Sequence, residues 1–119
     1  MKHILLIEDE GEMCLLLNLI LDDPDMNISH VKNLSSAHDF LQKNQPSLIL
    51  LDNRLPDGYG LDFIGYIKEN CPDTKVIMMS GVDASAADVA LETGADAFLR
   101  KPFRKAELLS SINSVLTAN

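Results

Sequence analysis

Short, mostly apolar runs alternate with longer helix-like stretches five times along this chain of 119 residues. The short runs are rich in leucine and β-branched residues and predict strands. These strands occupy residues 4–7, 27–31, 48–51, 76–79 and 95–99. The longer stretches repeat apolar positions at helical spacing and predict helices. These helices occupy residues 11–21, 34–43, 61–70, 83–93 and 106–116.

Several predicted strands contain no polar position, so both faces of their sheet must be covered by other parts of the chain. Strands alternating with helices meet this need as a parallel sheet with helices on both faces. Right-handed crossovers then make a doubly wound α/β fold the simplest solution. We find no repeat, linker or low-complexity tract, so residues 1–119 are predicted to form a single domain. Ligands of such folds bind at the carboxyl ends of the strands.

The composition excludes several classes of function. Ten basic and eighteen acidic residues give a net charge of −8, which opposes direct binding to nucleic acid or to an anionic membrane. The apolar runs are about half as long as a membrane span, and no signal-peptide pattern opens the chain. Cys14 and Cys71 have neither disulfide nor metal-binding spacing, so we expect both to be packing residues. Two isolated cysteines also suit a protein of the reducing cytoplasm. His3, His30 and His38 show no ligand or relay spacing and are expected to be surface or packing residues.

Acidic residues follow two of the predicted strands. Glu8, Asp9 and Glu10 come after the first strand, and Asp52 ends the third. If these strands are neighbours, the like charges raise one another's pKa unless a cation lies between them. Mg²⁺ suits one or two carboxylates with a carbonyl oxygen and retained waters. We expect Asp9 and Asp52 to be functional because each ends an apolar central strand, whereas Glu10 and Asp57 are expected to be solvated turn carboxylates.

The same strand ends carry groups that suit phosphate chemistry. A carboxylate such as Asp52 can act as a nucleophile toward phosphorus, and a metal ion with Lys101 can neutralise the oxygens of the transferring group. Ser80 offers a hydroxyl group to a phosphoryl oxygen, and Gly81 leaves room for the incoming group. The Lys101–Pro102 bond is a candidate cis peptide that would direct the lysine toward the site. The combination predicts a phosphoryl-transfer site at this edge of the sheet.

Taken in order, these residues resemble the receiver domains of bacterial response regulators, the chemotaxis-regulator-like family. The resemblance covers residues 4–116, with the acidic pair, the stretch Asp52-Asn53-Arg54-Leu55-Pro56-Asp57-Gly58-Tyr59-Gly60, Ser80 and Lys101-Pro102-Phe103. It implies a five-stranded parallel sheet with strand order 2-1-3-4-5 and Asp52 as the phosphoacceptor. It also implies catalytic roles for Ser80 and Lys101. The implied Mg²⁺ ligands are Glu8, Asp9, Asp52 and the backbone oxygen of Arg54.

Two residues depart from the family pattern. Glu8 stands where the family more often has aspartate, which lengthens the reach to the metal. Phe98 stands where the family often has a tyrosine that moves inward as the Ser/Thr is drawn to the phosphoryl group. The sequence leaves two roles open for Phe98. It is either a switch residue without a hydroxyl group or a packing residue in an edge strand.

The resemblance further implies a function in two-component phosphorelay signalling. A sensor histidine kinase or a phosphotransfer protein would phosphorylate Asp52, and Ser80 with the loop after it would move inward. The face made by the fourth helix, fifth strand and fifth helix would then bind an output domain or target protein, or form a phosphorylation-dependent homodimer. Such a switch catalyses only its own phosphorylation and dephosphorylation. The rate of acyl phosphate hydrolysis depends partly on residues beside the site, here Arg54 and Val82.

Three other interpretations are weaker. A Mg²⁺-dependent phosphatase with an aspartyl nucleophile needs a second aspartate two residues later as general acid, and that position is Arg54. A flavin- or nucleotide-binding carrier needs a phosphate cradle after the first strand, where three acids stand instead. A pseudo-receiver that is never phosphorylated has no need of the intact set of site residues. The sequence leaves open whether the chain stands alone or belongs to a longer regulator.

Overall fold

Five parallel strands form the main sheet of the computed structural model, which describes residues 2–81 and 84–117. The strands are β1 (Lys2–Ile7), β2 (Met26–Val31), β3 (Leu48–Asp52), β6 (Lys75–Ser80) and β7 (Ala97–Arg100). Their order in the sheet is β2-β1-β3-β6-β7. The two remaining strands, β4 (Arg54–Leu55) and β5 (Gly58–Tyr59), pair only with each other. The main sheet therefore has the 2-1-3-4-5 order that the family resemblance implies.

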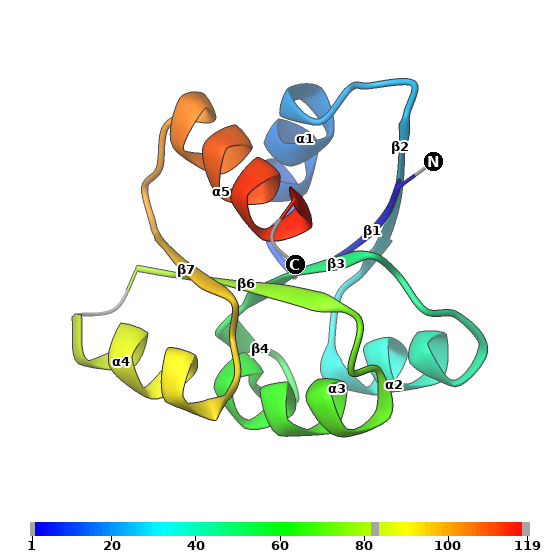
Figure 1. Cartoon of the computed structure of the whole chain (residues 1–119), viewed down its shortest axis with the longest axis vertical. Helices are drawn as coiled ribbons and strands as arrows, with labels where there is room; N and C mark the ends of the chain where they lie inside the picture. Colours follow the sequence, from blue (N-terminus) through cyan, green and yellow to red (C-terminus); the bar gives the residue numbers. More distant parts are fainter. Residues whose placement is uncertain (1, 82–83, 118–119) are drawn as a thin grey trace.

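Helices cover both faces of this sheet (Figure 1). One face carries α1 (Gly11–Ile20) and α5 (Lys105–Thr117). The other carries α2 (Leu34–Lys43), α3 (Ile64–Asn70) and α4 (Ala84–Thr93). The predicted doubly wound α/β fold is confirmed. None of the described helices is long and apolar enough to cross a membrane.

The central strands are apolar at consecutive positions because alternate side chains enter two different hydrophobic clusters. Leu6 and Leu50 pack in the cluster that includes residues of α1 and α5, whereas Leu5 and Leu51 pack in the cluster on the other face. All four side chains are at most 1% exposed. Burying each one stabilises the fold by about 2 kcal/mol. The middle of the sheet is therefore a rigid base for the residues at its edge.

The predicted elements are present, with differences at some of their ends and in one loop. β1 begins two residues early, because Lys2 already pairs with Met26 of β2. The third helix is divided into a 3-10 turn, η1 (Gly60–Phe63), and α3. The β4–β5 hairpin is not predicted by the sequence, because strands of two residues show no periodicity. The expected first residue of the fourth helix, Asp83, lies outside the described residues.

The carboxyl ends of four strands meet at one edge of the sheet. Ile7 of β1 pairs with Leu51 of β3, and Ser80 of β6 pairs with Arg100 of β7. The residues that follow these positions are therefore close together despite their separation in sequence. Because β1 lies between β2 and β3, the strand order reverses at β1, which is where a doubly wound fold binds its ligands.

Candidate functional site

Three carboxyl groups meet at the ends of β1 and β3. Oxygen atoms of Glu8, Asp9 and Asp52 all lie within 4.8 Å of one another. Glu8 is fully buried and Asp52 is 5% exposed, whereas Asp9 is exposed to solvent. The structure thus brings together the acidic residues that the sequence places at two separate strand ends.

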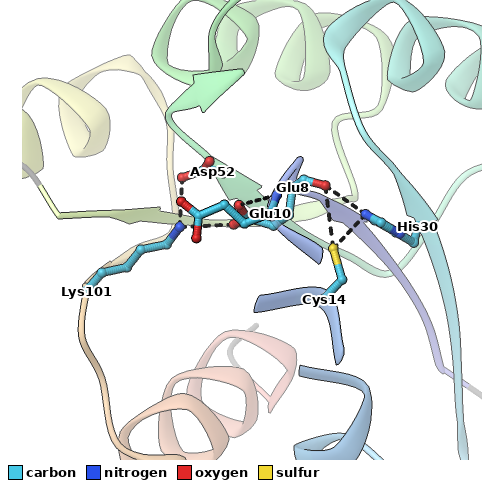
Figure 2. Close-up of polar contacts among 6 residues, drawn as sticks. All are labelled: Glu8, Glu10, Cys14, His30, Asp52 and Lys101. Atoms are coloured by element: carbon cyan, nitrogen blue, oxygen red, sulfur yellow. Dashed lines mark hydrogen bonds and ion pairs between the residues drawn. The ribbon is translucent and has the colours of Figure 1, made fainter. Parts of the chain in front are cut away.

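Lys101 brings a positive charge to these acids from the end of β7 (Figure 2). Its Nζ atom lies 3.0 Å from Glu8 Oε2 and 3.0 Å from Asp52 Oδ1. The Lys101 side chain is 16% exposed, so water screens these ion pairs only weakly. The peptide bond between Lys101 and Pro102 is cis, as predicted. Lys101 is close enough to Asp52 to contact a group attached to that carboxylate.

Burial is the main cause of the raised pKa of Glu8. Desolvation raises its pKa, the hydrogen bond from Lys101 lowers it, and the charge of Asp52 raises it, so the pKa of Glu8 increases from 4.5 to about 7. Desolvation lowers the pKa of Lys101, but hydrogen bonds to Glu8 and Asp52 outweigh it and raise that pKa above 10.5. Lys101 is therefore an ammonium ion at neutral pH. One positive charge faces three carboxyl groups, which leaves an excess of negative charge for a divalent cation.

A cavity of about 390 Å³ lies beside Asp52. It is lined by Glu10, Asp52, Arg54, Ser80, Gly81 and Lys101. Ser80 is 3% exposed, and its carbonyl oxygen accepts a 2.9 Å hydrogen bond from the Lys101 backbone. A Cβ atom added to Gly81 would have its nearest neighbour at 3.9 Å, so this side of the cavity is open. The cavity gives an incoming group access to the Asp52 carboxylate.

The backbone of Asp52 is held by a glycine that the sequence analysis did not single out. The Gly60 amide donates a 2.8 Å hydrogen bond to the Asn53 carbonyl, and the Asn53 side chain accepts one of 3.1 Å from Leu61. A Cβ atom on Gly60 would overlap the Asp52 carbonyl oxygen and approach Leu51 Cγ to 2.9 Å. Gly60 is therefore required for the loop to close against the site. Its only signal in the sequence is a second glycine two residues after Gly58.

Asp57 differs from the expected solvated turn carboxylate. It is exposed, but its two carboxylate oxygens accept hydrogen bonds from the amides of Leu34 (2.8 Å) and Ser35 (2.9 Å) at the start of α2. These two hydrogen bonds lower the pKa of Asp57 below 3.8. The next amide of α2, that of Ser36, is capped by the Asn33 side chain at 2.7 Å. The hairpin after Asp52 is thus fixed to α2, a long-range contact that local sequence cannot reveal.

The remaining residues singled out from the sequence are Glu10, Arg54, Phe98 and Val82. Glu10 is exposed, as expected, although it also lines the cavity. Arg54 is exposed at the start of β4 and lines the same cavity. Phe98 is half-buried and packs against the cluster on the α2–α4 face, which is compatible with both roles that the sequence leaves open. Val82 lies outside the described residues.

Known proteins resemble this chain over most of its length. The model of the response regulator receiver domain family matches residues 4–113. Over 118 residues the chain is 33% identical to the phosphate regulon transcriptional regulatory protein PhoB of Escherichia coli (strain K12), covering 97% of this chain and 52% of PhoB. It therefore spans about half the length of that relative. Over 119 residues it is 33% identical to the response regulator receiver protein CpdR of Brucella abortus (strain 2308), covering 99% of both chains.

Solved structures give the same assignment. The beryllofluoride-activated NtrC4 receiver domain dimer matches with a TM-score of 0.91 and 34% identity, covering 98% of this chain and 97% of that one. A CheY-like receiver domain protein of Methanospirillum hungatei JF-1 matches with a TM-score of 0.90 and 25% identity, covering 98% and 94% of the two chains. Family, sequence and fold agree over nearly the whole length. The chain belongs to the response regulator receiver domain family, the signalling switches of two-component systems.

Proposed function

We propose that Asp52 accepts a phosphoryl group from the phosphohistidine of a sensor histidine kinase or phosphotransfer protein. The observation that carries this proposal is the position of Lys101 Nζ, 3.0 Å from both Asp52 Oδ1 and Glu8 Oε2, at the edge of an open cavity. An ammonium ion at this position neutralises negative charge beside the nucleophile without blocking access from the cavity. Such an arrangement suits phosphoryl transfer, in which catalysis consists mostly of positioning and charge stabilisation.

The donor set favours Mg²⁺ as the cofactor. Hard carboxylate oxygens suit this ion, and the three acids exceed the single lysine in charge. Glu8, Asp9 and Asp52 would hold the ion, together with the backbone oxygen of Arg54 by analogy with the family. The bound ion would neutralise charge on the phosphoryl oxygens.

Each protein group has a defined task in the transfer. An Asp52 carboxylate oxygen forms the new bond to phosphorus while the bond from phosphorus to the donor's imidazole nitrogen breaks, and that nitrogen keeps the electron pair. Lys101 stays protonated and stabilises the phosphoryl oxygens by charge. The Ser80 side chain, which lines the cavity, is then drawn toward the new acyl phosphate. Hydrolysis of the acyl phosphate resets the switch, and Arg54 lies close enough to the site to influence its rate.

The output of the switch is proposed to lie on the α4–β7–α5 face. Phosphorylation would alter this face so that it binds an output domain or target protein, or pairs with a second copy. Two apolar side chains of α4, Val89 (46% exposed) and Leu91 (48% exposed), support an interaction there. The NtrC4 relative was solved as an activated dimer and PhoB is a transcriptional regulator, and both descriptions apply to those proteins.

We further propose that the protein acts in the cytoplasm. Cys14 and Cys71 are both buried free thiols, which suits a reducing compartment. They belong to the two different hydrophobic clusters, so the fold keeps them apart.

The decisive experiment is phosphorylation by acetyl phosphate with and without Mg²⁺, followed by intact mass measurement. We expect a single phosphoryl adduct that needs the metal and is lost in Asp52→Asn. Asp73→Asn, which changes an exposed acid beside the opposite edge of the sheet, should retain the adduct. An adduct that survives Asp52→Asn contradicts the proposal, as does wild-type protein that stays unmodified. Turnover of phosphate esters by the wild type would indicate a phosphatase instead.

A further inference from the structure

The backbone carbonyl of Glu8 is held by two side chains that the phosphorylation chemistry does not use (Figure 2). His30 Nε2 lies 2.7 Å from the Glu8 carbonyl oxygen, and Cys14 Sγ lies 3.6 Å from the same oxygen. The two side chains also touch each other, with 2.8 Å between Sγ and Nε2. They come from β2, which pairs with β1, and from α1, which begins shortly after β1 ends.

The acceptor in this cluster determines how the donors are arranged. A carbonyl oxygen only accepts hydrogen bonds, so a nitrogen 2.7 Å away must carry a proton. His30 therefore bears a hydrogen on Nε2 that points toward Glu8, because the other tautomer would place two lone pairs against each other. The Cys14 thiol then donates to the same carbonyl oxygen as a weaker second donor.

These contacts fix the backbone from which the candidate metal ligands project. The Glu8 amide donates a 3.1 Å hydrogen bond to Val31 of β2, and the Glu8 carbonyl receives His30 from the same strand. The peptide unit between Glu8 and Asp9 is therefore held beyond the end of β1. Figure 2 shows Glu8 between two groups, with its carboxylate toward Lys101 and its carbonyl toward His30 and Cys14.

We propose that His30 is a positioning residue for the cation site, with Cys14 in a supporting role. Holding the Glu8 carbonyl orients the carboxylates of Glu8 and Asp9, so the site is preorganised before the ion binds. This inference rests on the proposed function, because it assumes that these acids bind Mg²⁺. It gives a task to one histidine and one cysteine that sequence patterns assign only to packing or the surface.

The test is a Mg²⁺ titration of the unphosphorylated protein, followed by calorimetry or by amide chemical shifts. His30→Ala removes the donor and should raise the dissociation constant for Mg²⁺ about tenfold. His30→Gln, whose side-chain amide can donate to the same carbonyl, should stay within about threefold of wild type. Cys14→Ala removes only the weaker donor and should have a smaller effect, of about twofold.

His38→Ala is the matched control, since His38 is an exposed histidine on α2 whose ring contacts Tyr66 and not the cluster at Glu8. It should bind Mg²⁺ as the wild type does. The melting temperature in EDTA separates positioning from general destabilisation, and we expect similar values for His30→Ala and His38→Ala. In the metal-free protein, the amide resonance of Asp9 should move in His30→Ala and stay in place in His38→Ala.

The phosphorylation rate provides a second readout. In His30→Ala the Mg²⁺ concentration for half-maximal rate should rise, while the rate at saturating Mg²⁺ stays close to wild type. His30→Ala protein that binds Mg²⁺ as tightly as wild type overturns this inference and leaves the proposed function intact. Equal weakening in His30→Ala and His30→Gln also overturns it. Wild-type protein that binds no Mg²⁺ overturns both.

Discussion

Two lysines bind carboxylates at opposite edges of the same sheet, and the balance of charge differs between them. Lys68 of α3 donates to Asp96 Oδ2 at 2.7 Å and to the Thr74 carbonyl at 3.0 Å, and Asp96 Oδ2 also accepts the Val76 amide at 2.9 Å. This pair joins α3 to the beginnings of β6 and β7. One ammonium meets one carboxylate, so the charges are matched.

At the other edge, Lys101 pairs with Glu8 and Asp52, and the carboxylate of Asp9 lies close to both acids, so the charges are not matched. The exposed fractions differ as well: the Lys68 and Asp96 side chains are 25% and 26% exposed, whereas Glu8 is fully buried. A matched and partly hydrated pair joins structural elements and has no capacity for a further cation. An unmatched and buried cluster favours an additional positive charge. The difference supports the proposal that the Lys68–Asp96 pair is a structural contact and that the cluster beside Lys101 binds a cation.

The largest expected effect comes from exchanging each lysine for an apolar residue of similar length. Lys101→Met should slow phosphorylation of Asp52 by acetyl phosphate about a hundredfold or more, because a charge that stabilises the transferring oxygens is lost. Lys68→Met should leave that rate within about twofold, since it lies at the opposite edge. Intact mass measured over time at saturating Mg²⁺ gives both rates. Equal rates in the two variants would contradict the assignment of the sites.

Burial of the Glu8 carboxyl group, together with the nearby charge of Asp52, also predicts how stability depends on pH in the absence of metal. The folded-state pKa of Glu8 is about 7 and its ordinary value is 4.5, so its contribution to stability is present below pH 4.5 and is lost as the pH rises through 7. Between pH 5 and pH 8 the loss is on the order of 2 to 3 kcal/mol. Urea unfolding in EDTA at pH 5 and pH 8 measures it, and Glu8→Gln should remove most of the difference.

A matched control exists for the Glu8 variant. Glu69→Gln changes an exposed acid of α3 and should keep the pH dependence of the wild type. If Glu8→Gln and Glu69→Gln show the same dependence on pH, then burial of negative charge at Glu8 is not its source.

Each lysine site also depends on a nearby glycine, which allows a third comparison. An alanine at position 60 would overlap the Asp52 carbonyl oxygen, so Gly60→Ala should cost about 2 kcal/mol and also slow phosphorylation. Gly94 has a φ of +126°, and its added Cβ would lie 3.1 Å from Lys68 Cγ. Gly94→Ala should therefore cost about 1 to 2 kcal/mol while phosphorylation stays normal. Urea unfolding and the acetyl phosphate assay distinguish the two outcomes, and a normal rate in Gly60→Ala would refute the link to Asp52.

The sequence predicts those features that local chemistry determines. The buried strands are recognisable because Leu5, Leu6 and their counterparts in β3 leave no polar face, and this pattern requires helices on both sides. The strand ends then bring the acids and Lys101 to one edge. A charged residue directly after an apolar strand can be recognised from that stretch of sequence alone.

The remaining features depend on contacts between distant segments. Asp57 reads as a turn residue because its partners, the first amides of α2, precede it by more than twenty positions. His30 and Cys14 have no recognisable spacing, since their shared partner is a backbone carbonyl that every residue possesses. Lys68 shows no sign of its pairing with Asp96, because the two residues are 28 positions apart in the sequence. Pairing across the fold is visible only in the folded structure.

The smallest expected effect concerns the matched pair itself. Lys68→Met removes the partner of a carboxylate that keeps its hydrogen bond from Val76, and the site is about a quarter exposed, so we expect a loss of only about 1 kcal/mol. This corresponds to a melting temperature about 3 to 6 °C lower. Lys43→Met, at an exposed lysine of α2, should have a smaller effect. A much larger loss in Lys68→Met would mean that the matched pair contributes as much electrostatic free energy as the unmatched cluster. Charge balance would then no longer distinguish a structural contact from a binding site.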